Sequence, residues 1–337
     1  DQYGMDTVFL SNSGAEAVEN AIKICYDHRN GQYGVTFEGA CHGRTLGALS
    51  LNRSKGVYRR RFPEIPGIHD APFCRDRTCD PTTCSCGFFP GDDGVSVLRR
   101  RLGEYGDIAP EEVSYVVLEP VQGEGGYHIP SEAFMAEVDE LCTEHDVPLV
   151  VDEIQTGLGR SGEMWASDHF AIEPDVIAAG KGLRVGATIS RREVFPEERA
   201  RLSSTWGAGD ILASLQGALT LDIVQERDLM ANAVTRGRQC RELLVDADPD
   251  HVVDVRQLGL LVGVEFDTRA RRGAAMEACL DRGLLTLGCG VKTMRLLPPL
   301  DATAREIALG TEVLLDAIDD PRVERARVVT TETDEAA

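Results

Sequence analysis

Two buried, strand-like runs of this sequence end in charged side chains. The run "PLVVDEIQTG" (148–157) is apolar until it reaches Asp152 and Glu153, and "DVIAAGK" ends in Lys181. Charged groups are almost never buried without a partner, so a carboxylate at Asp152 needs a cation beside it. Because ligands of parallel sheets sit at the carboxyl ends of the strands, we expect this carboxylate and this amine to face one ligand. Taken alone, Lys181 could be an ordinary solvated residue at the end of a strand.

A third strand-like run, "TVFLSNSG", passes directly into a helix pattern. The turn between them consists of Ser13, Gly14 and Ala15, and we call it the phosphate turn. Glycine lets the backbone bend there, and the free amides at the start of a helix attract a phosphate. A plain serine-capped helix is the alternative interpretation. Together, the carboxylate, the lysine and this turn suggest a cofactor with a ring nitrogen, an aldehyde and a phosphate, and pyridoxal 5'-phosphate carries all three.

The elements that must position these residues alternate between strand and helix patterns. Near-continuous Val, Ile and Leu runs separated by helices predict an α/β fold with a mainly parallel sheet covered on both faces. A long helical stretch over about residues 211–244 then leads to a smaller α+β unit. We expect a large domain over residues 1–232, a smaller C-terminal domain over 233–322, and a disordered acidic tail over 323–337. The chain starts at Asp1, near the end of a strand pattern, so we expect a native N-terminal segment to be missing.

Composition narrows the classes of function. The chain has 35 basic and 56 acidic residues, a net charge of −21, which argues against nucleic acid and membrane surfaces as partners. Nearly all the positive charge is arginine, and an acidic, lysine-poor surface predicts a halophilic source. The sequence contains no long apolar run and no charged-then-apolar leader, so we expect a cytoplasmic protein.

Successive motifs resemble those of class III aminotransferases, which are pyridoxal-phosphate enzymes of fold type I. The motifs occur in order between Phe9 and about Asp319: "FLSNSGAEAVENAIK", "CHGRT", "LEPVQGEGGY", "VVDEIQTGLGRSGEMW", "SSTWGAGD" and "RLLPPL". The family includes ornithine, acetylornithine and 4-aminobutyrate aminotransferases, and archaeal amino-acid racemases are similar to it. The resemblance implies a large domain built on a seven-stranded type of sheet and a smaller α+β C-terminal domain.

The resemblance also implies roles for the residues that bind the cofactor. It implies that Lys181 forms the covalent link to the cofactor aldehyde and moves the Cα proton of the substrate. Asp152 matches the carboxylate that holds the protonated pyridine nitrogen, so the expected partner of this buried charge is a cofactor cation. Ile154 matches the residue packed on one ring face, and Gln155 the one that hydrogen-bonds the phenolic oxygen. Thr205 matches a threonine that reaches the partner subunit's cofactor phosphate, which implies a homodimer with shared active sites.

The position before "HG" departs from the family pattern. The family usually has Tyr or Phe there to stack on the cofactor ring, whereas this chain has Cys41 followed by His42. Loss of aromatic stacking, worth about 0.5–1.5 kcal/mol, predicts weaker cofactor holding or a shifted reaction preference. His42 could take the stacking role, and Cys41 could equally be a small filler under a loop.

Two further residues bear on the substrate. By resemblance, Arg295 grips an α-carboxylate through paired hydrogen bonds, and Glu124 neutralises this arginine when the reacting amine has no α-carboxylate at that end. The expected donor is therefore a basic or ω-amino acid of the ornithine, acetylornithine or 4-aminobutyrate type, and the acceptor a 2-oxo acid such as 2-oxoglutarate. An amino-acid racemase using the same lysine and cofactor is the alternative.

A cysteine-rich stretch, "CRDRTCDPTTCSCG", contains Cys74, Cys79, Cys84 and Cys86. Four thiolates could bind zinc or an iron–sulfur centre, although the spacing matches neither the common paired zinc pattern nor the ferredoxin pattern. Reduced thiols or a disulfide are the alternatives, and a metal here would be structural. A second alternative function is an inactive protein of this fold organised by a metal at this cluster.

Overall fold

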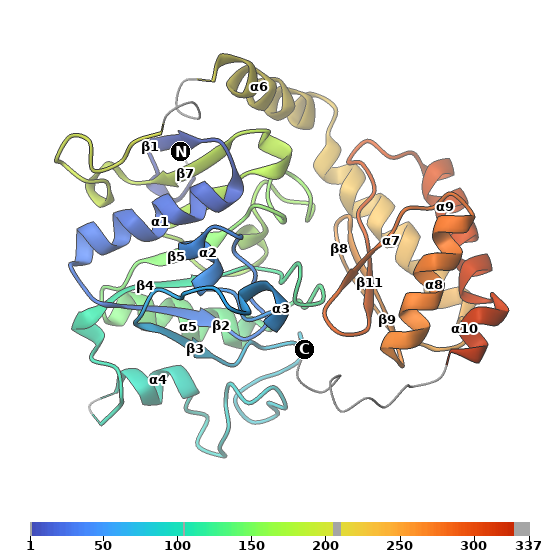
Figure 1. The fold of residues 1–337 in the computed structure, drawn as a ribbon, viewed down its shortest axis with the longest axis horizontal. Coiled ribbons are helices and arrows are strands. Elements are labelled where there is room, and N and C mark those ends of the chain that lie inside the picture. The colour runs from blue at the N-terminus through green and yellow to red at the C-terminus, as the bar shows by residue number, and fades with distance from the viewer. Residues whose placement is uncertain (1, 104, 205–209, 327–337) are drawn as a thin grey trace.

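The larger part of the fold is built on a seven-stranded sheet (Figure 1). The computed structural model describes residues 2–103, 105–204 and 210–326. Strands lie in the order β1-β7-β6-β5-β4-β2-β3. β7 runs antiparallel to both of its neighbours, and the other adjacent pairs are parallel. The bounds are β1 Thr7–Ser11, β2 Tyr33–Phe37, β3 Ile68–Ala71, β4 Val113–Leu118, β5 Leu149–Asp152, β6 Val176–Ala179 and β7 Gly186–Ser190. The expected mainly parallel seven-stranded sheet is confirmed.

Helices cover both faces of this sheet, as its apolar strands require. Alternate residues of β4 and β5 point to opposite faces, so both faces of these two strands are buried. One face packs on α1 (Gly14–Arg29), and the other packs on α5 (Glu132–Glu144). Shorter helices are α2 Leu46–Ser50, α3 Gly56–Arg59 and α4 Val97–Leu102, and 3-10 turns are η1 Gln2–Gly4, η2 Pro110–Glu112, η3 Ala166–His169, η4 Lys181–Leu183 and η5 Arg192–Val194.

The C-terminal part forms a second, antiparallel sheet in the order β10-β11-β9-β8. Its strands are β8 Val252–Leu258, β9 Leu261–Phe266, β10 Leu287–Cys289 and β11 Thr293–Leu296. Helices α7 (Leu229–Ala247), α8 (Arg269–Asp281) and α9 (Ala304–Ile318) pack on this sheet through one apolar core. Figure 1 shows this smaller unit beside the large sheet, with α6 (Ile211–Glu226) and α7 forming the connection. The expected smaller α+β unit is thus present.

The structure differs from the sequence-based bounds in two places. The long helical stretch is two helices, because Asp228 adopts a left-handed φ of 50° between α6 and α7. The expected domain boundary after residue 232 falls inside α7, so this division of the chain stays a prediction. The first residues of the expected disordered tail are helical: α10 (Pro321–Arg325) is capped by Asp320, and Val323 is fully buried. Residues 327–337 lie outside the described part of the chain.

Loops that follow β4 and β5 join the two units at one edge of the large sheet. The Leu260 amide donates to the carbonyl of Arg160 at 2.9 Å, and the guanidinium of Arg160 donates to the Pro298 carbonyl at 2.6 Å. The Gly290 amide donates to the carbonyl of Glu124 at 2.7 Å. These bonds bring the smaller unit against the carboxyl ends of the strands, where the candidate residues lie. Among the described residues, no helix is long and apolar enough to cross a membrane.

Candidate active site

The carboxylate of Asp152 lies at the end of β5 and is almost completely buried, with an exposure of 4%. Its Oδ2 lies 2.8 Å from Nδ1 of His42, and its Oδ1 accepts the Ile154 amide at 3.0 Å. The buried charge therefore has a partner within the protein, which the sequence analysis did not anticipate. The possible stacking role of His42 stays a prediction, because a hydrogen bond at Nδ1 leaves the faces of the imidazole ring free.

His42 is fixed on its other side as well. Its backbone amide donates to Oδ1 of Asn52 at 2.7 Å, and Nδ2 of Asn52 donates to the Gly43 carbonyl at 2.7 Å. Desolvation alone would lower the pKa of His42, but the hydrogen bond to Asp152 and the nearby carboxylates raise it above its ordinary value. Nδ1 is therefore favoured as the donor to Asp152.

Glu119 is a buried acid that the sequence analysis missed. It directly follows β4, and its two carboxyl oxygens accept the amides of Cys41 at 2.9 Å and Gly123 at 2.8 Å. Burial raises the pKa of Glu119 to about 7, with His42 and Asp152 acting on it in opposite directions. The available signal was the one used for Asp152, a carboxylate directly after a buried apolar strand.

Lys181 lies two residues after the end of β6, at the same edge of the sheet as Asp152. Its backbone has a left-handed φ of 45°, a conformation that costs energy in a residue with a side chain. The lysine is open to solvent at this edge, yet the surrounding protein desolvates it enough to lower the pKa of its ammonium. The charges of Asp152 and Glu119 partly oppose this shift. A lowered pKa makes the neutral, nucleophilic amine easier to form.

The phosphate turn has the local geometry expected of a helix start. Ser13 is the N-cap of α1, and its hydroxyl accepts the Glu16 amide at 3.2 Å. The carboxylate of Glu16 in turn accepts the amide of Asn12 at 2.7 Å. The 16-residue helix α1 therefore starts directly at this turn, and the start of a helix is where a phosphate binds.

Three glycines let this turn approach the other candidate residues. A Cβ added to Gly14 would lie 2.8 Å from Cδ1 of Ile154, and one added to Gly180 would lie 3.2 Å from Cα of Gly14. A Cβ on Gly43, whose φ is +140°, would lie 2.8 Å from Cβ of Ala15. The turn, the residue before Lys181 and the "CHG" loop are therefore packed around one point. Side chains at these glycines would collide with these neighbours and push the three segments apart.

Glu124 and Arg295 join the two units by an ion pair. Nη2 of Arg295 lies 2.5 Å from Oε1 of Glu124, and Nη1 donates to Oε1 of Gln155 at 3.4 Å. The second oxygen of Glu124 is bonded to Nζ of Lys55 at 3.0 Å and to the hydroxyl of Tyr58 at 3.2 Å. Burial opposes ionisation of Glu124, but Arg295 and Lys55 outweigh it and lower its pKa. Glu124 is therefore an anion shared by two cations.

Cys41 lies half-buried beside this group. Desolvation and the carboxylates of Glu119 and Glu124 raise the pKa of its thiol to about 12, so Cys41 remains a neutral thiol. Thr205 lies outside the described residues. In the segment between β3 and α4, the sulfurs of Cys74, Cys79 and Cys86 form one group, and Cys84 lies beside Cys86.

The donor set fits pyridoxal phosphate. A buried carboxylate, a lysine of lowered pKa and a helix-start turn lie at one sheet edge, with Ile154 and Gln155 two and three residues after Asp152. These groups are suited to a ring nitrogen, an aldehyde, a phosphate, a ring face and a phenolic oxygen, respectively. The fold and this site together are those of a pyridoxal-phosphate enzyme of fold type I.

The family can be stated more narrowly. Residues 1–318 match the family described as aminotransferase class-III, and the chain belongs to this family of pyridoxal-phosphate-dependent enzymes. It is 34% identical over 318 residues to an acetylornithine aminotransferase from Bacillus subtilis, covering 93% of this chain and 76% of that protein. It is 32% identical over 327 residues to a putrescine aminotransferase from Pectobacterium atrosepticum, and the match covers 92% of this chain and 65% of that protein. The solved structure of a lysine aminotransferase from M. tuberculosis superimposes on this chain with a TM-score of 0.82 at 29% identity. The superposition covers 93% of this chain and 75% of that protein.

Proposed function

We propose that the protein transfers the amino group of a basic or ω-amino acid to a 2-oxo acid such as 2-oxoglutarate. The observation that carries this proposal is the ion pair between Glu124 and Arg295. When the pair is closed, it presents little net charge to a donor whose reacting end lacks a carboxylate. When Glu124 releases Arg295 and keeps its bonds to Lys55 and Tyr58, Arg295 can form paired hydrogen bonds to the α-carboxylate of the oxo acid.

The proposal assigns the remaining residues to proton and charge control. Bound pyridoxal phosphate supplies the electron sink for the carbanion that forms when the Cα proton leaves. Lys181 takes this proton and returns it, because its lowered pKa favours the neutral amine. Asp152 holds the cationic ring nitrogen, and His42 fixes the orientation of Asp152. Gln155 lies against Arg295 and accepts a bond from Tyr127 at 3.1 Å, which sets its side chain beside the ring position.

The related proteins support this class of donor. The two relatives are named for acetylornithine and putrescine, and the solved structure for lysine. All three compounds have a terminal amino group on an unbranched chain, at a carbon that carries no carboxylate. A pocket with a switchable arginine suits such donors, since the same protein must bind an amine end and an α-carboxylate end in turn.

The test is a half-reaction with full-length protein loaded with pyridoxal phosphate. Acetylornithine, ornithine, lysine, putrescine and 4-aminobutyrate are each supplied without oxo acid, and the carbonyl product is measured. About one equivalent per active site is expected with the true donor, and added 2-oxoglutarate should then yield glutamate and further turnover. Lys181→Ala should lower this activity by roughly 10²–10⁴-fold. Loss of optical rotation without any carbonyl product would instead establish a racemase.

We further propose that two copies form a homodimer with shared active sites. Helix α6 carries a stripe of exposed apolar side chains spaced four residues apart: Ile211, Leu215, Leu219 and Ile223. Such a stripe on one helix face normally packs on another surface. Analytical ultracentrifugation should show a dimer for the wild type and a monomer for Leu215→Asp. A wild type that sediments as a monomer at micromolar concentration would contradict the shared-site arrangement.

A further inference from the structure

The cysteine-rich stretch lies in a long segment without regular structure. Residues 72–96, between β3 and α4, contain no helix or strand. Loops of this length are uncommon in folded domains unless something holds them in place. Aromatic residues anchor both ends: Phe73 and Phe88 are buried, and each ring packs edge-on against Phe134 of α5. The cysteines lie between these anchors.

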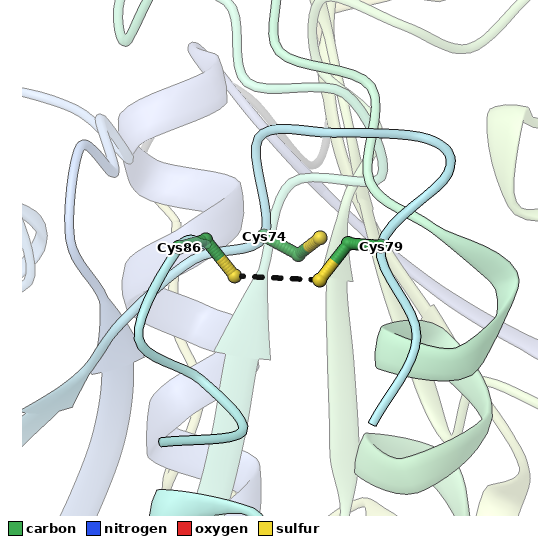
Figure 2. Close-up of side chains that lie close together, drawn as sticks. All are labelled: Cys74, Cys79 and Cys86. Carbon is green, nitrogen blue, oxygen red and sulfur yellow. Dashed lines mark hydrogen bonds between the residues drawn. The ribbon is translucent and has the colours of Figure 1, made fainter. Parts of the chain in front are cut away.

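The sulfur atoms converge across this segment. Sγ of Cys79 lies 3.8 Å from Sγ of Cys86, and Sγ of Cys84 lies 3.1 Å from Sγ of Cys86. The sulfurs of Cys74, Cys79 and Cys86 all lie within 4.8 Å of one another. Figure 2 shows these three side chains pointing toward a common centre from different parts of the loop. The fold therefore brings together cysteines that lie up to 12 positions apart in the sequence.

These separations suit a single tetrahedral ion. Zinc binds thiolates at about 2.3 Å, which places the sulfurs roughly 3.8 Å apart along each edge of the tetrahedron. We propose that Cys74, Cys79 and Cys86, whose sulfurs lie within 4.8 Å of one another, bind one zinc-type divalent ion as a closed structural site, and that Cys84, whose sulfur lies 3.1 Å from that of Cys86, completes the set of four ligands on binding. Binding displaces one proton from each thiol and forms four sulfur–metal bonds, with no change of oxidation state.

The surroundings of the sulfurs agree with a structural site. Cys74 and Cys79 are buried, and Cys84 and Cys86 are half-buried, so the centre is shielded from most of the solvent. The Phe89 amide donates to Sγ of Cys84 at 3.4 Å, a bond that stabilises a thiolate ligand. Sγ of Cys74 donates to the Asp76 carbonyl at 3.2 Å in this structure, and metal binding replaces that bond.

A single ion explains the geometry better than the other occupants of a cysteine cluster. In a four-iron cluster each thiolate binds a different iron, which keeps the sulfurs farther apart than the group of Cys74, Cys79 and Cys86. A disulfide uses two of the four sulfurs and leaves the convergence of the others unexplained. A divalent ion uses all four.

The location indicates what the ion stabilises. The residues directly after Cys74 line a cavity together with residues of α7 and β8, namely Arg238, Arg241 and Arg256. A metal ion bound by the cysteines would therefore hold residues 72–96 in place where they lie beside α7 and β8 of the smaller unit. Loss of the ion is expected to loosen this loop and lower thermal stability, while the residues at the carboxyl ends of the strands stay in place.

The first test is the metal content of the full-length protein, purified under reducing conditions without chelator. Elemental analysis should find about one zinc ion per chain. Cobalt exchanged into the site should give thiolate-to-cobalt charge-transfer absorption and the visible bands of a tetrahedral complex. The proposal would be overturned if the protein held less than roughly a tenth of a metal ion per chain and all four thiols reacted with Ellman's reagent.

Variants separate this cluster from the other cysteines. Cys84→Ser and Cys86→Ser change half-buried positions, so they should fold and lose most of the zinc. Cys240→Ser is the matched control, because Cys240 is a buried cysteine of α7 beside Thr311, outside the cluster. It should keep the zinc. A zinc chelator should lower the melting temperature of the wild type and of Cys240→Ser, but not of Cys86→Ser.

Two other results would also contradict the single-ion site. A disulfide between any two of the four cysteines, found by mass mapping of unreduced peptides from fresh protein, would assign the convergence to oxidation. Stoichiometric iron with acid-labile sulfide would assign it to a cluster. None of these measurements depends on transaminase activity, so they stand whether or not the proposed donor class is correct.

Discussion

Nδ1 of His42 lies 2.8 Å from Oδ2 of Asp152, and both side chains are buried at the end of β5. A carboxylate in this position has to remain ionised to hold a cationic ring nitrogen. Although burial opposes it, the bond to Asp152 raises the pKa of His42 and so favours a positive charge beside the carboxylate, and the bond from the His42 backbone amide to Asn52 holds the backbone that carries the imidazole. His42 thus acts on the chemistry through Asp152 and is a positioning residue.

His42→Leu should lower both the free energy of unfolding and kcat. Without the imidazole, the apoprotein keeps a buried carboxylate with one fewer partner, which should cost about 1–3 kcal/mol of unfolding free energy. By comparison with other outer-shell partners of a bound group, kcat should fall roughly 10–100-fold. His42→Asn retains a side-chain N–H donor and should recover part of both losses. Equal kcat for His42→Leu and wild type, measured at saturating cofactor, would remove the positioning role.

Glu124→Gln should change which donors are used. The variant removes the negative charge that neutralises Arg295, so a donor without an α-carboxylate leaves a buried guanidinium unpaired. A charge-assisted bond is worth about 1.5–3 kcal/mol, so kcat/KM for putrescine relative to glutamate should drop roughly 10–150-fold. The measurement is steady-state kinetics with both donors. Glu64→Gln is the control, because it removes an exposed carboxylate that pairs with Arg59 and leaves Glu124 and Arg295 unchanged. An unchanged ratio for Glu124→Gln would rule out the switch.

Glu119 should make the protein less stable as pH rises. Its pKa of about 7 in the fold exceeds the ordinary 4.5, so between these values the folded state binds more protons than the unfolded chain. Its contribution to stability is then full below about pH 4.5 and is lost as the pH rises through about 7. Glu119→Gln lacks this titration and should gain stability relative to wild type between about pH 5 and pH 8. The exposed Glu111→Gln is the control, and melting temperatures across this range supply the comparison.

Cys41→Phe should tighten cofactor binding. A ring at this position can stack on the cofactor, and stacking contributes about 0.5–1.5 kcal/mol, or roughly a 2–12-fold lower dissociation constant. Cys41→Ser keeps the small size and should bind as the wild type does. Equilibrium dialysis of the apoproteins against pyridoxal phosphate measures the constants. If Cys41→Phe binds the cofactor no more tightly than Cys41→Ser does, a side chain at position 41 does not stack on the cofactor ring.

Much of the fold follows from local patterns in the sequence. Apolar runs separated by amphipathic stretches predict the parallel strands, because strands buried on both faces can carry few polar side chains. The reactive residues that end these runs, Asp152 and Lys181, could be located for the same reason. The break between α6 and α7 could not, since the left-handed conformation of Asp228 leaves no clear mark on the residue pattern. Glu119 had a readable signal, a carboxylate after a buried strand.

The sequence by itself determined which chemistry is possible: an amine, a carboxylate and a phosphate turn at strand ends, and four thiols in one loop. Only the tertiary structure decided which groups meet. His42 and Asp152 are 110 residues apart, and Lys55 and Glu124 are 69 apart. Local propensity fixes the conformation of a few neighbouring residues, whereas such contacts depend on how whole strands and helices pack. The charge states of the site, set by burial and by these distant partners, therefore become visible only in the folded chain.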